Sequence, residues 1–232
     1  MRIVAGEHRG RTLAVPDGLD TRPTTDRVRE AVMSSVFSKL GGFEGAYVLD
    51  AFSGTGAMGL EAMSRGAGGA VLNDFSPKSR ACIEENASSL GYRRPDVRIT
   101  SVDVLNAGIP GGSRRYSLIF LDPPYATSQV DVARILAKAE EDGLLADDCL
   151  VVYEHDAPAD ENIWVSQFGD DQLSYGDVCD SPVGEGETMP NAGKQIVSNV
   201  RIAPFAILDE KRYGKTYVTY LRPTRASDLG DV

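Results

Sequence analysis

The stretch YSLIFLDPPY, residues Tyr116 to Tyr125, sets the expected fold, because an apolar run with strand character ends abruptly in Asp-Pro-Pro-Tyr. Two adjacent prolines have no N–H to donate and cannot continue a sheet ladder. Each also favours an extended conformation in the residue before it. We therefore expect the Asp122 carboxylate, the Pro123 carbonyl and the Tyr125 ring to be fixed at a strand end. Two acceptors beside an aromatic ring suit an exocyclic amine on a flat base.

Strands and helices alternate on both sides of this run, which predicts a parallel, doubly wound α/β sheet. Besides 116–121, strands are predicted at residues 47–52, 70–74, 97–102 and 150–154. Helices are predicted at about residues 26–40, from the glycine-rich turn that ends at Gly59 to about residue 65, and at residues 77–90 and 130–142. Two last strands, at 197–205 and 216–221, are expected to pair as an antiparallel hairpin with 211–215 between them, which makes seven strands.

The 232 residues suit one large domain with small additions. Residues 1–21 are expected to form a basic, β-rich arm, and residues 22–223 the main domain. Within it, 157–195 is acidic and lacks periodicity, which indicates a mobile surface insert. The tail, 224–232, is expected to be disordered. The insert carries eight acidic residues and no Lys or Arg up to residue 193, so it accounts for most of the formal net charge of −10.

Composition argues against several kinds of protein. The three cysteines lie far apart and there are only two histidines, which favours free thiols in a reducing cytoplasm over a disulfide framework or a metal site. No apolar run approaches the ~20 residues that span a bilayer. The first thirty residues hold six arginines, and binding depends on such local patches more than on net charge.

A glycine-rich turn, SGTGAMG, follows the predicted strand that ends near Asp50. Its GxGxxG pattern alone is also compatible with a nicotinamide-dependent oxidoreductase or a flexible turn. A carboxylate at Asp50, however, would repel a pyrophosphate and suit a cationic amino group. The next three strands also end in acids, at Asp74, Asp103 and Asp122. Four acids in register predict a site for a ribose diol, an adenine amine and a cationic ligand.

Together these motifs resemble the class I S-adenosylmethionine-dependent methyltransferases, and DPPY is similar to the motif of amino-methyltransferases that act on adenine N6 or guanine N2. The segments GEHRGR (6–11) and RPTTDRVRE (22–30) resemble one family, the RsmD-type bacterial 16S rRNA guanine-N2 methyltransferases. RYGKT (212–216) is similar to that family's closing hairpin. One departure is Asn73, which stands where the family usually has an acid, so either Asn73 or the following Asp74 binds the ribose.

The resemblance implies three groups of site residues. The cofactor, S-adenosylmethionine, would contact Asp50, Phe52, Gly54, Gly56, Asn73 or Asp74, Asp103, Val104 and Asp122. The catalytic group would be Asp122, Pro123, Pro124 and Tyr125. RNA would contact His8, Arg9, Arg11, Arg22, Arg27 and Arg29. No metal is expected.

The implied function is transfer of a methyl group to the N2 amine of a guanine in 16S rRNA, free or within an assembled small ribosomal subunit. The expected form is a cytoplasmic monomer. An adenine-N6 methyltransferase acting on DNA or RNA stays open, because DPPY does not choose between the two bases. An oxidoreductase and a non-catalytic RNA-binding protein are the remaining alternatives.

Overall fold

The computed structural model describes residues 1–15, 26–164 and 205–224. The chain divides into two compact units, and all of these residues belong to one of them, which comprises Met1–Ser166 and Ile202–Val232. The other unit, Gln167–Arg201, lies outside the described residues, as do most of the predicted insert and the predicted tail from residue 225.

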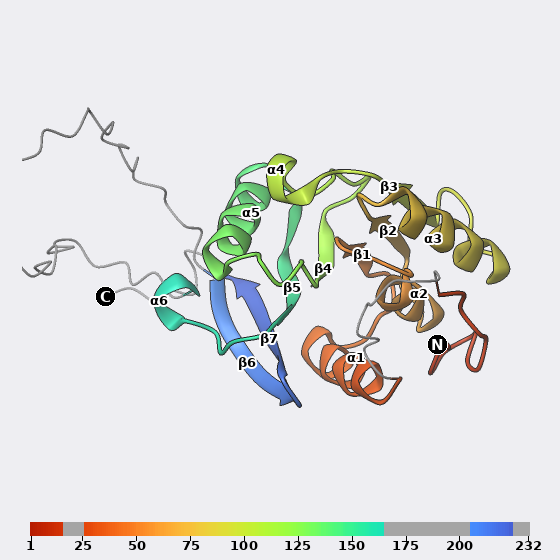
Figure 1. Cartoon of the computed structure of the whole chain (residues 1–232), viewed down its shortest axis with the longest axis horizontal. Helices are drawn as coiled ribbons and strands as arrows, with labels where there is room; N and C mark the ends of the chain where they lie inside the picture. The colour runs from red at the N-terminus through yellow and green to blue at the C-terminus, as the bar shows by residue number, and fades with distance from the viewer. Residues whose placement is uncertain (16–25, 165–204, 225–232) are drawn as a thin grey trace, which may run out of the picture. The chain divides into compact units, whose positions relative to one another are not determined.

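A seven-stranded sheet in the order β3-β2-β1-β4-β5-β7-β6 forms the centre of this unit (Figure 1). β1 to β5 pair in parallel, and β7 pairs antiparallel with both β5 and β6. The predicted doubly wound sheet with an antiparallel hairpin is therefore confirmed. The strands are β1 (Tyr47–Asp50), β2 (Gly69–Asn73), β3 (Val97–Thr100), β4 (Tyr116–Leu121), β5 (Leu145–His155), β6 (Phe205–Tyr213) and β7 (Thr216–Pro223).

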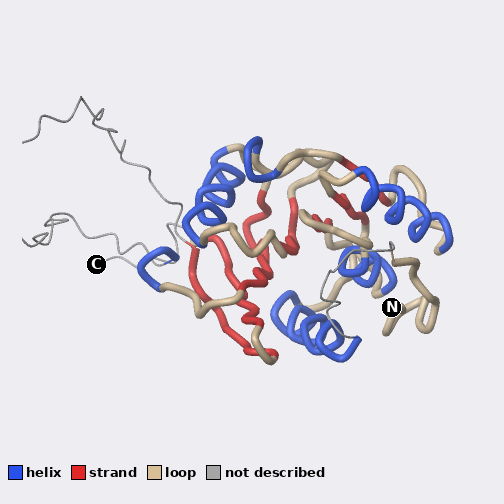
Figure 2. Tube along the Cα trace, in the orientation of Figure 1, coloured by secondary structure: helices blue, strands red, loops and turns tan. Residues whose placement is uncertain are grey.

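Helices surround the strands, as the tube in Figure 2 shows. Two of them begin at a serine cap, because the hydroxyl of Ser76 accepts from Ser79 N and that of Ser128 accepts from Asp131 N. The helices are α1 (Asp26–Leu40), α2 (Ala57–Ser64), α3 (Pro77–Ser89), α4 (Val104–Ala107), α5 (Gln129–Glu141) and α6 (Glu161–Trp164).

The two faces of the sheet bury separate apolar clusters. Alternate residues of β4 go to opposite faces, so Leu118 and Phe120 pack with residues of α1, α2 and α3, whereas Ile119 and Leu121 pack with residues of α5. Burial on both faces explains why this strand reads as a continuous apolar run. Its first polar side chain beyond the core is Asp122, which therefore lies at the carboxyl edge of the sheet.

Several element boundaries differ from those predicted. β5 starts at Leu145, with a register shift against β4, instead of at 150. β6 covers Phe205–Tyr213, so residues predicted as the hairpin loop belong to the strand, and the turn is at Gly214, whose φ of 66° favours glycine. α4 was not predicted. The predicted strand residues 197–204 lie outside the described part of the chain.

Residues 157–164, the start of the predicted acidic insert, lie within the described part of the chain and pack on the domain, and the rest of the insert lies outside it. α6 lies within residues 157–164, and Trp164 is buried against the α5 side of the sheet. The indole N–H of Trp164 donates to the side-chain oxygen of Gln129 at 3.2 Å. Burial of the Trp164 ring, whose N–H has a hydrogen-bond acceptor, therefore stabilises the packing of α6 despite its acidic composition.

The arm is less β-rich than predicted, because its described part, residues 1–15, has one isolated bridge, between Arg2 and Thr12. Its backbone is instead bound to α2. The buried Glu61 carboxylate accepts from Val4 N at 2.7 Å and from Ala5 N at 2.9 Å. A side-chain anion inside the fold thus replaces the neighbouring strand that backbone N–H groups would otherwise need.

Candidate functional site

A cavity of about 950 Å³ lies at the carboxyl edge of the sheet, where ligands bind in folds of this kind. Five acidic side chains line it, one from the end of each parallel strand or the loop that follows. In sheet order they are Asp103, Asp74, Asp50, Asp122 and Glu154. The sequence predicted the first four. Glu154 was missed although it is the last residue of the strand predicted at 150–154, so the strand-end pattern that indicated the other four acids could have indicated it too.

The glycine turn brings the start of α2 to the cavity. Gly54 and Gly56 have φ values of 56° and 80°, which other residues adopt with strain. Gly59 allows close packing, because a Cβ there would lie 2.2 Å from a methyl group of Leu72. The Gly59 N–H donates to the Asp50 carboxylate at 3.0 Å. The start of the helix is therefore held against the end of the strand beneath the turn.

Asn73 and Asp74 differ in what they can offer a ligand. The Asn73 amide is 1% exposed and makes four hydrogen bonds, donating to Ala51 O and Val102 O and accepting from Thr100 Oγ1 and Val102 N. Its hydrogen-bonding capacity is used by the protein. Asp74 is only partly buried, and its carboxylate accepts from Gly54 N and Ser76 N, both at 2.8 Å. Each carboxylate oxygen keeps a further lone pair for a hydroxyl donor.

The loop after β3 supplies the third acid. Asp103 precedes α4, and its carboxylate accepts from Asn106 Nδ2 at 2.7 Å. Val104 is buried, while Leu105 is 43% exposed, and all three line the cavity. The predicted cofactor residue Phe52 lines it too. An apolar slot edged by an acid suits a flat ring with an amino group.

The Asp122–Tyr125 segment forms the opposite wall of the cavity. Asp122 remains solvent-accessible, and Tyr125 is 74% exposed, so both can meet a ligand that enters from solvent. A second cavity of about 230 Å³ shares these residues and extends the site towards His155 and Lys215. The wall between the two cavities thus carries the three groups that the motif predicts. These are the Asp122 carboxylate, the Pro123 carbonyl and the Tyr125 ring.

Burial in the cavity changes the acidity of two carboxyls. It raises the pKa of Asp50 to about 7, against the opposing hydrogen bond from Gly59 and with added repulsion from Asp122 and Asp74. Crowding by the concave walls raises the pKa of Asp122 to about 6, although its side chain stays accessible. A cationic ligand between them would favour the ionised form of both groups.

The residues predicted to contact RNA are spread over the arm and α1. Arg9, Arg11 and Arg27 are exposed, and the Arg11 guanidinium donates to Ser89 O at 2.7 Å. His8 is half-buried and packs edge-to-face against Tyr92, with ring centroids 5.1 Å apart. Arg22 lies outside the described residues.

The prediction that Arg29 contacts RNA is wrong, because its side chain is 1% exposed. It pairs with Asp26 at 2.8 Å and lies 3.8 Å from the Glu61 carboxylate. It also donates to Arg2 O. The buried Glu61 carboxylate on α2 draws the Arg29 guanidinium inward. Helical periodicity alone cannot reveal an anion from another element.

Within residues 1–15, 26–164 and 205–224, no group of three or more His, Cys, Asp or Glu side chains is placed to hold a metal ion. In the same residues, no helix is long and apolar enough to cross a membrane.

Comparison with known proteins gives a consistent set of relatives. A family model described as "Conserved hypothetical protein 95" matches residues 1–176. "Ribosomal RNA small subunit methyltransferase D" of Escherichia coli is 33% identical over 154 residues, which cover 66% of this chain and 74% of that protein. "Putative rRNA methyltransferase YlbH" of Bacillus subtilis is 33% identical over 159 residues, which cover 67% and 83%.

A solved structure described as "Putative methyltransferase yhhF from Escherichia coli" has a similar fold. It superposes with a TM-score of 0.64 at 26% identity and covers 96% of this chain and 97% of its own.

Proposed function

The chain belongs to the Conserved hypothetical protein 95 family, and from that membership and the cavity we propose that it is an rRNA methyltransferase that modifies the N2 amine of a guanine in 16S rRNA with S-adenosylmethionine as donor. The expected resemblance to the RsmD-type family is confirmed by the same match. The names of the relatives support rRNA as the substrate. The observation that carries the proposal is the meeting of the glycine turn, the strand-end acids and Asp122–Tyr125 in one cavity.

The cavity fits the proposed donor. Its volume of about 950 Å³ is of the size found for small-molecule sites, roughly 300–1,000 Å³. Asp50 is 4% exposed, and repulsion from Asp122 and Asp74 adds to the burial that raises its pKa, so a positively charged ligand beside these carboxyls would stabilise their ionised forms. Asp74 would bind the ribose hydroxyls, because the hydrogen-bonding groups of the Asn73 amide already have partners within the protein. Asp103, Val104 and Leu105 would hold the adenine edge.

The donor, when bound, supplies an electrophilic methyl group on a positively charged sulfur. The guanine N2 amine is a weak nucleophile, because its lone pair is delocalised into the ring. Asp122 and the Pro123 carbonyl would accept its two N–H bonds, favouring a pyramidal nitrogen and directing its lone pair into the cavity. Pro124 holds the segment rigid, and Tyr125 would stack on the base. Such positioning can contribute on the order of 7–11 kcal/mol to lowering the barrier.

Proton transfer would also involve Asp122. After the methyl group is transferred, the nitrogen carries one proton too many. A carboxylate with a pKa of about 6 can accept it and pass it to solvent. The target base must leave its stack to reach this depth. The exposed arginines Arg9, Arg11 and Arg27 would contact the RNA backbone. The protein would act as a cytoplasmic monomer on free 16S rRNA or on the assembled small subunit.

The test uses small ribosomal subunits from a strain that lacks the gene. Purified protein and methyl-labelled S-adenosylmethionine are added, and the labelled nucleoside is identified by mass spectrometry. N2-methylguanosine is expected. N6-methyladenosine would favour the adenine enzyme, and no labelled product in subunits or free rRNA would favour an RNA-binding protein. Calorimetry that shows binding of NADH and none of S-adenosylmethionine would favour an oxidoreductase.

A further inference from the structure

Glu154 is the acid of this cavity that the sequence motifs do not include. The parallel register of β4 and β5 pairs Leu121 with Tyr153, so the next position on each strand places Asp122 beside Glu154. Neighbouring strands lie about 4.8 Å apart, which puts two carboxylates within reach of a single flat ring. Both side chains line the 950 Å³ cavity, and both also line the smaller one.

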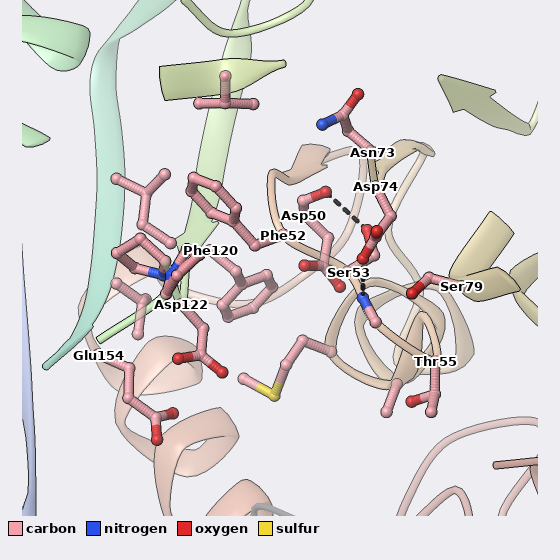
Figure 3. Close-up of a pocket in the computed structure, with 18 of the residues that line it drawn as sticks. Asp50, Phe52, Ser53, Thr55, Asn73, Asp74, Ser79, Phe120, Asp122 and Glu154 are labelled. Atoms are coloured by element: carbon pink, nitrogen blue, oxygen red, sulfur yellow. Dashed lines mark hydrogen bonds between the residues drawn. The ribbon is translucent and has the colours of Figure 1, made fainter. Parts of the chain in front are cut away.

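The two carboxylates also lie on the same face of the sheet. Side chains alternate along a strand, and Phe120 and Val152, two residues earlier, both belong to the cluster that packs with α1, α2 and α3. Asp122 and Glu154 therefore point to that face as well. Figure 3 shows both carboxylates directed into the pocket from their two strands, with Asp50 and Asp74 on the far side.

The edge of guanine that carries N2 has a second donor. N1–H lies beside the N2 amine, so this edge presents three N–H bonds in a row. Adenine has a bare N1 with a lone pair at the corresponding position, which a carboxylate repels. Asp122 and the Pro123 carbonyl, in the proposed function, use the two N2–H bonds. The N1–H then needs an acceptor next to Asp122.

We propose that Glu154 accepts the N1–H of the target guanine and thereby selects guanine over bases whose N1 is an acceptor. The inference rests on the proposed function, because it concerns the same base in the same cavity. Glu154 is half-buried, so its carboxylate can bind a donor that enters from the cavity. A carboxylate accepts several donors at once, so hydrogen bonds within the protein do not prevent this role. Glu154 would thus add a selection for guanine that the Asp-Pro-Pro-Tyr segment does not provide.

The test compares guanosine with 2-aminopurine at the modified position. 2-Aminopurine keeps the 2-amino group but has a lone pair at N1 instead of a hydrogen. The wild-type reaction first locates the target nucleotide. Small subunits are then reconstituted with 16S rRNA ligated to carry either base at that site. The proteins compared are wild type, Glu154→Gln, Glu154→Asp and Asp147→Asn. Asp147 is a matched control, because it is an 85% exposed carboxylate on the same strand.

The expected result is a change of preference. For wild type and for Asp147→Asn, kcat/KM is about tenfold to a hundredfold higher with subunits that carry guanosine than with subunits that carry 2-aminopurine. Glu154→Gln loses guanosine turnover by at least tenfold and narrows the preference, because its amide can donate to the bare N1. Calorimetric affinity for S-adenosylmethionine stays within twofold. Glu154→Asp keeps the preference for guanosine over 2-aminopurine at a reduced turnover. This variant tests the inference if the glutamine variant does not fold.

The inference is overturned if Glu154→Gln retains the wild-type guanosine turnover or the wild-type preference, or if Glu154→Asp loses the preference while folded. A wild-type product other than N2-methylguanosine overturns the proposed function instead. The two failures are therefore distinguishable.

Discussion

At the ends of β1 and β2 the protein itself binds the polar side chains, whereas at the end of β4 they face solvent. The Asn73 amide makes four internal hydrogen bonds, and Asp74 and Asp50 accept from backbone N–H groups of the glycine turn. Across the cavity, Asp122 is accessible and Tyr125 is 74% exposed. The first wall is ordered by the protein's own hydrogen bonds and, in the proposed function, would bind the methyl donor. The second wall leaves its acceptors and its ring accessible and, in the proposed function, would bind the base.

The largest effect is expected at Asp122, on the open wall. Asp122→Ala removes the acceptor that would hold the amine in the proposed function, and it is expected to lower kcat by about 10³-fold, in line with the loss of a preorganised polar group. RNA affinity and melting temperature should change little, because the side chain is accessible. Single-turnover methylation and filter binding on the same sample measure both. Turnover like that of wild type would contradict the clamp.

On the bonded wall, Asp74→Ala is expected to have mixed consequences. It removes the carboxylate that would accept from the ribose in the proposed function, and also the partner of Gly54 N and Ser76 N. S-adenosylmethionine affinity should fall by roughly 10²-fold, and stability by about 1–3 kcal/mol for the unsatisfied backbone groups. Calorimetry and urea unfolding test this pair of effects. A loss of affinity with unchanged stability would mean that the turn does not depend on this carboxylate.

Tyr125→Ala removes the stacking surface of the open wall. Stacking of a base on an aromatic side chain contributes about 1–3 kcal/mol, so kcat/KM for the RNA substrate should fall roughly tenfold to a hundredfold. Tyr125→Phe, which keeps the ring, is the matched control and should stay within about threefold of wild type. Equal losses in both variants would assign the role to the hydroxyl instead of the ring.

The rate should also depend on pH in a stated direction. Asp122 must be ionised to accept N–H bonds, and burial raises its pKa to about 6. Turnover is therefore expected to be constant at high pH and to fall about tenfold per unit as the pH drops below the pKa. The bound cationic donor favours the carboxylate, so the break in kcat should lie below that of the free protein. A rate that rises as the pH falls would exclude this role.

The smallest effect is expected on the arm. Arg9 is exposed, and Arg9→Ala should weaken RNA binding only severalfold while reducing the slope of log affinity against log salt by about one. Arg29→Ala is the contrasting variant, because Arg29 is buried between Asp26 and Glu61 whereas Arg9 is exposed. Its loss should destabilise the fold by about 3–5 kcal/mol. Thermal unfolding and salt titrations of both variants separate surface contact from internal pairing.

Much of the fold and part of the site could be predicted from local patterns. The apolar run before Asp122 gave the strand, and the prolines gave its end, because both effects act within a few residues. The same holds for the glycine turn, where Gly54 and Gly56 adopt positive φ values. Patterns failed where a distant group decided the outcome, as for Arg29, which pairs with an acid of α2.

The sequence by itself determined the five parallel strands and the longer helices between them, the rigid Asp-Pro-Pro-Tyr segment and the positions of four strand-end acids, because backbone sterics and side-chain periodicity are local. Only the tertiary structure decided which polar groups are available. Strand register places Glu154 beside Asp122. The Asn73 amide is hydrogen-bonded within the protein, and Arg29 is buried and pairs with Asp26. Register and burial depend on contacts between residues far apart in the chain, and no local pattern contains them.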